Sequence, residues 1–310
     1  MAGLVEQGVQ GVSEVAATSK GERRNSGASS FLRSTEQLLP SMLLVLIGLG
    51  LPLVLMARYS LAIFEPGAYD ISGYSLANYI SFFLDPFYLQ ILGRTLLVAF
   101  SCTALCLVFG VPAAYLISRI RSPILRTILL LTMIIPLLLG NGVRSAGWMM
   151  LLSDGGMINS LLRALGLIEE PIRILYTGHA VVISLLALTL PFMIISLQSV
   201  FESLGRAYEE AALTMGAGPW RTLFRVTLPL AMPGIFSGCL LCFVQGMNAY
   251  ASPVLLGGPQ FQMMAPKVYE QAIKINNWPL AATLAFVLMG VTMILTVISS
   301  LRLQKRYGAL

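Results

Sequence analysis

The segment Glu202–Pro229, ESLGRAYEEAALTMGAGPWRTLFRVTLP, separates two long hydrophobic runs and mixes polar with apolar residues in a helical pattern. Its apolar residues recur at i, i+4, i+7, i+8 and i+11, which gives one apolar helix face: Leu204, Tyr208, Ala211, Ala212 and Met215. Glu202, Arg206 and Glu210 follow one another at i, i+4 spacing, in an order that supports a helix. The pattern predicts a short amphipathic helix in the first half of the segment.

Glycine and proline divide the segment into two parts. Gly216 and Gly218 are expected to end the first helix, because glycine tolerates the left-handed conformation of a helix C-cap. Pro219 suits the first turn of a second helix, where its missing N–H costs nothing. That helix presents its own apolar face, formed by Trp220, Leu223 and Phe224. We expect Pro229 to close the segment, so that the next hydrophobic run begins after it.

The composition predicts a membrane protein. The chain has 310 residues, of which 56% are hydrophobic and 11% charged, whereas soluble domains carry about 25% charged residues. The net charge of +6 is judged by its location along the chain and gives no indication of nucleic-acid binding. A single His179 and two separated cysteine pairs, Cys102 with Cys106 and Cys239 with Cys242, indicate small core residues rather than metal ligands.

Six apolar runs follow a polar beginning, and each is close to the ~20 residues that span a bilayer. We expect spans at about Leu38–Met56, Thr95–Ser118, Ile124–Gly142, His179–Leu197, Pro233–Tyr250 and Leu280–Leu301. Residues 1–36 are polar without a sustained period, which predicts a disordered tail. The expected organisation is therefore a tail over 1–36 and an all-α domain of six transmembrane helices over 37–310.

The distribution of Lys and Arg predicts the orientation. One side of the membrane receives a dense set: Lys20, Arg23, Arg24, Arg33, Arg119, Arg121, Arg126, Arg206, Arg221, Arg225, Arg302, Lys305 and Arg306. The other side receives fewer, in longer loops: Arg58, Arg144, Arg163, Arg173, Lys267 and Lys274. The positive-inside rule places the first set, both termini and segment 202–229 in the cytoplasm. The external loops either dock a carrier protein or cap the helix bundle, and the sequence leaves both possibilities open.

Segment 202–229 resembles the EAA loop of ABC-importer permeases. The family pattern is Glu-Ala-Ala, three residues, Gly, nine residues, Ile, one residue and Leu-Pro. Glu210, Ala211, Ala212, Gly216, Leu228 and Pro229 match it at every spacing, and Val226 replaces the isoleucine with another β-branched residue. The resemblance implies the type I importer fold and a loop that couples the permease to an ATPase. Glu210 would bond an arginine of that ATPase or, alternatively, pair with Arg206 on its own helix.

The resemblance also implies a set of partners. These are an ABC ATPase dimer, a second permease subunit that is expected to be a paralogue of this chain, a periplasmic solute-binding protein and the lipid of a bacterial inner membrane. The chain has no G-x-x-x-x-G-K-[ST] motif of its own. We therefore expect no enzyme activity, catalytic residue, cofactor or metal here, with ATP and Mg²⁺ on the partner ATPase.

Shorter matches favour the spermidine/putrescine branch of these permeases: residues 144–148, 155–159, 190–192 and 253–258. The solute would then be a polyamine, although the branch also includes permeases for aminophosphonates, opines and other small amines. A polyamine favours carboxylates and aromatic faces. The candidate pathway residues are Trp148, Asp154, Gln245, Asn248 and Tyr250, with Asn141 near them in the outer ends of spans. Interhelical hydrogen bonding and interfacial anchoring are alternative roles for the same residues.

Two other classes of protein compete with an importer subunit. An ion- or proton-coupled secondary transporter usually carries ionisable residues inside its spans, and the predicted spans have essentially none. In a non-transporting membrane scaffold, the EAA-like spacing would be accidental. The sequence therefore favours the ABC permease.

Overall fold

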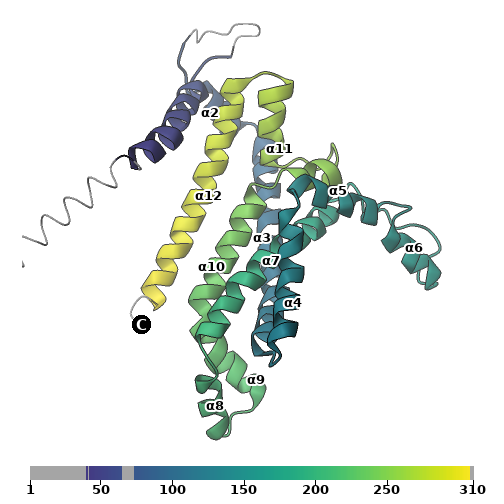
Figure 1. Cartoon of the computed structure of the whole chain (residues 1–310). Coiled ribbons are helices and arrows are strands. Elements are labelled where there is room, and N and C mark those ends of the chain that lie inside the picture. Colours follow the sequence, from purple (N-terminus) through teal and green to yellow (C-terminus); the bar gives the residue numbers. More distant parts are fainter. Residues whose placement is uncertain (1–39, 41, 65–72, 308–310) are drawn as a thin grey trace, which may run out of the picture. The chain divides into compact units, whose positions relative to one another are not determined.

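The computed structural model describes residues 40, 42–64 and 73–307, and the regular structure within them is helical (Figure 1). One isolated bridge pairs Ala62 with Tyr74. The all-α fold class predicted from the sequence is confirmed. The predicted polar tail, residues 1–36, lies outside the described residues. The chain divides into two compact units, Met1–Arg58 and Tyr59–Leu310, which are described separately.

The first unit contributes most of the helix Met42–Ser60. Its mean hydropathy is 2.0, and none of its most apolar window is buried within the protein. A helix that is apolar all round and exposed on every side needs a lipid or protein environment. It corresponds to the first predicted span, Leu38–Met56, and ends one turn later.

The second unit is a bundle of helices joined by short turns. Its α-helices are α2 (Ala77–Leu84), α3 (Pro86–Arg119), α4 (Pro123–Ile134), α5 (Asn141–Leu152), α6 (Met157–Ala164), α7 (Gly178–Ser203), α8 (Ala207–Thr214), α9 (Pro219–Thr222), α10 (Leu228–Met247), α11 (Met264–Tyr269) and α12 (Trp278–Tyr307). A 3₁₀ turn, Ile135–Leu138, follows α4. Three π-helical segments are η2 (Leu223–Thr227), η3 (Pro253–Gly257) and η4 (Glu270–Lys274).

The core lies where α3, α7 and α10 pack side by side. Small residues allow their backbones to approach closely, as is usual for helices in membranes. A Cβ added to Gly246 of α10 would lie 3.0 Å from the Cα of Ala99 on α3, and one on Gly110 would lie 2.7 Å from Met193 of α7. A second cluster, which includes Phe82, joins α2, α3, α10, α11 and α12.

The cysteines lie in this core, as the sequence predicts. The thiols of Cys102 and Cys106 contact the Thr189 hydroxyl at 3.3 Å and 3.1 Å. The Cys242 thiol points to the Thr189 carbonyl from α10, at 3.8 Å. The sequence did not predict that cysteines of both pairs would contact the same residue, Thr189 of α7, because the pairs are far apart along the chain.

Within the described residues, five helices are long and apolar enough to cross a membrane: Met42–Ser60, Pro86–Arg119, Gly178–Ser203, Pro219–Met247 and Trp278–Leu303. Three of them extend predicted spans at both ends, and the first is shifted four residues toward the C-terminus. Pro112, Pro191 and Pro233 lie inside α3, α7 and α10. The fifth predicted span was wrong at its start, because the helix begins at Pro219 rather than Pro233. The π-helical segment η2 carries α9 directly into α10, so Pro229 sits in a continuous helix and does not close the segment.

The third predicted span, Ile124–Gly142, is broken. Two helical stretches, Pro123–Leu138 and Asn141–Ala164, replace it, and the chain bends by 102° between them. They make a sixth span only if this bent pair is counted as one span. Pro136 lies in the 3₁₀ turn before the bend, and Gly140 is extended at it, with φ −60° and ψ 146°. Proline removes a helical hydrogen bond, which explains why the apolar run does not form one straight helix.

Figure 1 shows which elements share an end of the second unit. α8 and α9 lie at one end, and the C-terminal end of α12 points toward it, whereas α2 and the N-terminal end of α12 lie at the other end; α5 and α6 project to one side between the two ends. The turn between α3 and α4 lies beside α8, because Arg119 contacts Glu209 there. The arginines predicted to share a side with segment 202–229 therefore lie next to it in this turn.

Candidate functional site

Residues 207–222, which we call the knob, consist of α8, a tight turn and α9. The turn is a Schellman motif at Gly216, whose φ is +81°. The Gly216 N–H donates to the Leu213 carbonyl and the Ala217 N–H to the Ala212 carbonyl, both at 3.0 Å. Gly216 thus occupies the left-handed position that the sequence analysis gave it. Gly218 instead forms the extended N-cap of α9, so its assignment as a helix end was wrong.

The start of the predicted first helix differs from the structure. Glu202 belongs to α7, Leu204 is the C-cap of α7, and Gly205 follows with φ +64°. Arg206 is only the N-cap of α8. The predicted i, i+4 ladder from Glu202 to Glu210 therefore spans two helices. The periodicity continued across the break because α7 and α8 are separated by a single left-handed turn.

The knob presents apolar side chains outward. Met215 is 81% exposed and Trp220 is 73% exposed, whereas Ala212 is 3% exposed. The Trp220 and Phe224 rings stack with centroids 6.3 Å apart. Other exposed members of this surface are Tyr208 and Leu213. Exposed aromatic and methionine side chains in a small area are typical of a surface that binds another protein.

Two neighbouring glutamates of α8 have different surroundings. Glu209 accepts a hydrogen bond from Arg119 Nη2 at 2.6 Å and another from Thr227 Oγ1 at 3.1 Å. Glu210 is exposed, and the structure gives it no ion pair with any residue it describes. The suggested Glu210–Arg206 pair does not form, because the Arg206 guanidinium donates to the Arg119 carbonyl at 3.1 Å. The sequence analysis missed Glu209, since the family pattern singles out only its neighbour.

The remaining family-matched residues have their own environments. Ala211 is exposed, and Leu228 and Pro229 line an apolar groove of about 940 Å³. The groove lies between α3 and the continuous helix from α9 to α10, and Trp220 and Phe224 form part of its wall.

At the end of α10 far from the knob, a polar cavity of about 340 Å³ brings together four residues that the sequence analysis named: Asn141, Gln245, Asn248 and Tyr250. Ser252 also lines this cavity, and its hydroxyl bonds those of Ser145 and Ser184, at 3.0 Å each. Gln245 lies in the last turn of α10 and Asn248 is its C-cap, so the position of these polar residues near the outer end of the predicted span was sufficient to name them.

Trp148 and Asp154 do not join this cavity. Trp148 is half-buried and packs against the core formed by α3, α7 and α10. Asp154 is exposed in the turn between α5 and α6. The bend of 102° after the 3₁₀ turn redirects this part of the chain; prolines in the spans suggest bent helices, but the sequence does not show which helix bends.

A cation that the sequence analysis did not select stands beside the polar cavity. Arg144 donates to Asn141 Oδ1 and to the Leu188 carbonyl, and both acceptor residues line the cavity. No carboxylate lines the cavity among the described residues, and Arg144 has no ion-pair partner among them. The lining residues of the cavity are therefore uncharged, both polar and apolar, and one guanidinium stands at its wall.

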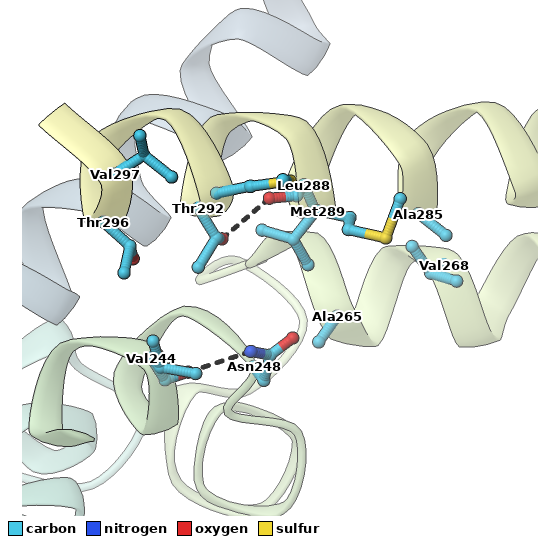
Figure 2. Close-up of a pocket in the computed structure, with 11 residues that line it drawn as sticks. Val244, Asn248, Ala265, Val268, Ala285, Leu288, Met289, Thr292, Thr296 and Val297 are labelled. Carbon is cyan, nitrogen blue, oxygen red and sulfur yellow. Dashed lines mark hydrogen bonds between the residues drawn. The ribbon is translucent and has the colours of Figure 1, made fainter. Parts of the chain in front are cut away.

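Asn248 also lines a second cavity, of about 570 Å³, between α10, α11 and α12. Figure 2 shows Thr292 and Thr296 pointing from α12 into this space, with Asn248 on the facing side. The Asn248 amide donates to the Val244 carbonyl at 2.9 Å, which leaves its oxygen free to accept. Thr296 Oγ1 is buried without a hydrogen-bond partner. Asn248 thus connects the two cavities.

Comparison with known proteins identifies the family. The model of the family described as "Binding-protein-dependent transport system inner membrane component" matches residues 106–308. The chain belongs to this family. It is therefore a permease subunit of an ABC importer, a multi-pass protein of the inner membrane rather than an enzyme.

Several characterised permeases are similar in sequence. The chain is 35% identical over 236 residues to the spermidine/putrescine transport system permease PotB of Salmonella typhimurium, covering 75% of this chain and 82% of the relative. It is 35% identical over 215 residues to PotB of Escherichia coli, covering 69% and 78%. The molybdenum transport system permease ModB of Mycobacterium tuberculosis is 30% identical over 207 residues, covering 64% and 74%.

Two solved structures share the fold. A crystal structure of a bacterial ABC transporter that imports the acidic polysaccharide alginate matches with a TM-score of 0.71 at 18% identity, covering 92% of this chain and 99% of that one. The alginate transporter in complex with its periplasmic protein, bound to an alginate pentasaccharide, matches with a TM-score of 0.70 at 18% identity, covering 87% and 93%. The type I importer fold expected from the resemblance is confirmed.

Proposed function

We propose that this permease moves a polyamine from the periplasm to the cytoplasm, together with a second permease, an ATPase dimer and a periplasmic binding protein. The observation that carries the proposal is the 35% identity with spermidine/putrescine permeases over most of the chain. ATP and Mg²⁺ would bind the ATPase subunits only.

The knob is the proposed contact with the ATPase. Its exposed Met215 and Trp220, with Phe224 of η2 beside them, offer an apolar surface. Glu210, which has no ion pair among the described residues, offers a carboxylate for an arginine of the partner. Gly216 allows α8 and α9 to fold back on each other within one turn. Closure of the ATPase dimer on ATP would push or pull this surface and shift the permease between inward- and outward-facing states.

The polar cavity is the proposed entrance of the solute pathway. Gln245, Asn248 and Tyr250 present hydrogen-bond acceptors for ammonium groups, and the Tyr250 ring stands 5.1 Å from that of Tyr269, centroid to centroid. A pathway must hold its solute weakly enough to release it. A neutral lining without a carboxylate satisfies this requirement and leaves selection to the binding protein.

Uptake assays test the solute. A clean deletion of the gene, in a strain without a redundant system, is expected to lose uptake of labelled putrescine, spermidine or both, because no other pathway accepts them. Complementation with the wild-type gene is the control and should restore uptake. Normal uptake of both amines in the deletion strain would contradict the polyamine assignment.

A second candidate solute is a small zwitterionic or anionic amine, such as an aminophosphonate or an opine. The observation in its favour is Arg144, whose guanidinium stands at the wall of the cavity and has neither an ion-pair partner nor a carboxylate in the cavity lining among the residues that the structure describes. The same deletion strain distinguishes the two, because loss of aminophosphonate or opine uptake with normal polyamine uptake would support this alternative.

The orientation of the permease is also a proposal. We expect both termini and Gly216 to be cytoplasmic and Gly155 and Gly258 to be external, because Lys and Arg concentrate on the knob side. Single cysteines at residues 155, 216 and 258, in a cysteine-free background, test this by labelling intact cells with an impermeant thiol reagent. Labelling is expected at 155 and 258. Strong labelling at 216 before the cells are opened would reverse the orientation.

A further inference from the structure

Glu209 attaches the knob to its own bundle. Within α8, Ala212 is the residue buried against the rest of the protein, whereas the Glu209 side chain is 13% exposed and the paired Arg119 side chain 16% exposed. Glu209 Oε1 accepts from both Arg119 Nη2 and Thr227 Oγ1. One carboxylate oxygen therefore joins α8 to the end of α3 and to η2 before α10.

We propose that Arg119, Glu209 and Thr227 form a lock that transmits the movement of the knob to α3 and α10. The proposal rests on the function proposed above, in which the knob contacts the ATPase. In this lock, Arg119 and Glu209 are positioning residues. They touch neither solute nor ATP, and they fix the angle at which α8 meets the bundle.

Arg119 is held from several directions, which makes it a rigid anchor. It is the last residue of α3, and its guanidinium also donates to the Phe201 and Gly205 carbonyls at 3.4 Å each. These carbonyls lie at the C-terminal end of α7, where helix carbonyls lack partners and a cation is favoured. The guanidinium carbon lies 5.4 Å from the centre of the Tyr115 ring. The anchor thus joins α3 and α7, the helices of the central core.

Thr227 provides the connection to α10. It is the last residue of η2, it is buried, and its hydroxyl bonds Glu209 at 3.1 Å. π-helical turns often occur at functional positions, and here one leads from the knob directly into the helix that carries Gln245 and Asn248. A displacement of Glu209 would therefore act on the base of α10, while the cavity residues stand at its other end.

The adjacent glutamates consequently have separate roles. Neighbouring residues of a helix point about 100° apart because the helix has 3.6 residues per turn. With Glu209 held inward by Arg119, Glu210 faces solvent, where the partner surface would meet it. The lock sets which of the two carboxylates is offered to the ATPase.

The same end of the bundle supplies a matched control. Glu202 pairs with Arg126 at 3.0 Å, but their side chains are 33% and 39% exposed, and the pair joins α7 to α4 without contacting α8. Exposed ion pairs contribute little, whereas removing one partner of a desolvated pair is costly. Glu202→Gln therefore removes a carboxylate of the same kind at the same end of the bundle but leaves the lock intact.

The test measures solute transported per ATP hydrolysed by the purified complex in liposomes, with its binding protein present. Glu209→Gln is expected to lower this ratio roughly tenfold or more, with the ATPase still bound and still hydrolysing ATP. Glu202→Gln should stay near the wild-type ratio. Arg119→Lys should retain an intermediate ratio, since it keeps the charge but loses the forked geometry. Arg119→Gln combined with Glu209→Gln should be no worse than either alone, as expected for partners in one interaction.

Several results would overturn the lock. One is a Glu209→Gln ratio equal to that of Glu202→Gln, and another is strictly additive effects of the Arg119 and Glu209 changes. A parallel loss of ATPase binding and transport would also overturn it, since that indicates a merely structural role. If Arg119→Gln does not reach the membrane, the near-isosteric variants Glu209→Gln and Thr227→Val test the lock instead, through their ratios of solute transported to ATP hydrolysed.

Failure of the proposed function gives a different result. In that case the wild-type complex shows no polyamine-dependent transport, or Gly216→Trp transports normally. The lock alone fails when Gly216→Trp is inactive and Glu209→Gln behaves like wild type.

Discussion

Replacing Gly216 by tryptophan is expected to abolish transport and to release the ATPase from the purified complex, while the permease stays in the membrane at near-normal level. Gly216 has a φ of +81°, a conformation that costs an L-residue about 1–2 kcal/mol. A Cβ there would meet no atom within 4 Å, so the indole has room to project from the knob beside exposed Met215. The added bulk stands where the partner surface should fit, far from the core of α3, α7 and α10.

Two matched variants separate the causes of this loss. Gly216→Ala carries the same backbone strain without the bulk, so it should keep most of the bound ATPase. Glu210→Ala should reduce transport with partial assembly, because the exposed apolar surface of Tyr208, Met215 and Trp220 remains. Co-purification of the ATPase, measured beside uptake in the same cells, decides the outcome. Normal assembly and transport by Gly216→Trp would show that the knob is not the coupling element.

The general architecture could be predicted because its signals are local. Runs of about 20 apolar residues specify spans, and the Gly216 turn follows from the conformational freedom of glycine. The break near Gly140 and the continuous helix through Pro229 were not predictable in this way. Both depend on how the chain satisfies carbonyls next to proline: a 3₁₀ turn precedes the break, whereas the π-helical segment η2 precedes Pro229. A hydropathy pattern does not distinguish these outcomes.

The candidate site was predictable in part for a related reason. Gln245 and Asn248 share one end of a helix, so their spacing placed them together, and the cavity contains both. Asp154 was grouped with them by its charge and its position along the chain. It does not line the cavity, because the chain bends by 102° between Pro123–Leu138 and Asn141–Ala164. Glu209 was missed because its partners, Arg119 and Thr227, are 90 and 18 residues distant in sequence. Only the packed bundle shows which of two adjacent glutamates is held inward.

Replacing Asn248 by tryptophan is expected to stop transport while the ATPase stays bound. Gly216→Trp, in contrast, is expected to lose both transport and the bound ATPase. Asn248 lines both the polar cavity of about 340 Å³ and the second cavity of about 570 Å³. An indole at this position would enlarge the side chain at the part of the wall that both cavities share. Each increase of about 1.4 kcal/mol in a free-energy barrier slows a step roughly tenfold. We expect the indole to raise the barrier to solute passage by several times that amount.

The fold should tolerate the Asn248→Trp change, because Asn248 is exposed and its amide bonds only the Val244 carbonyl of its own helix. The knob lies at the other end of α10, so ATPase co-purification and basal ATP hydrolysis should match the wild type. Asn248→Ser is the control, since it replaces the amide with a smaller polar hydroxyl and enlarges the passage, and it should retain uptake. Normal uptake by Asn248→Trp would place the solute pathway elsewhere. Loss of the bound ATPase would instead mean that the change disturbs the bundle as a whole, so both measurements are made on the same preparation.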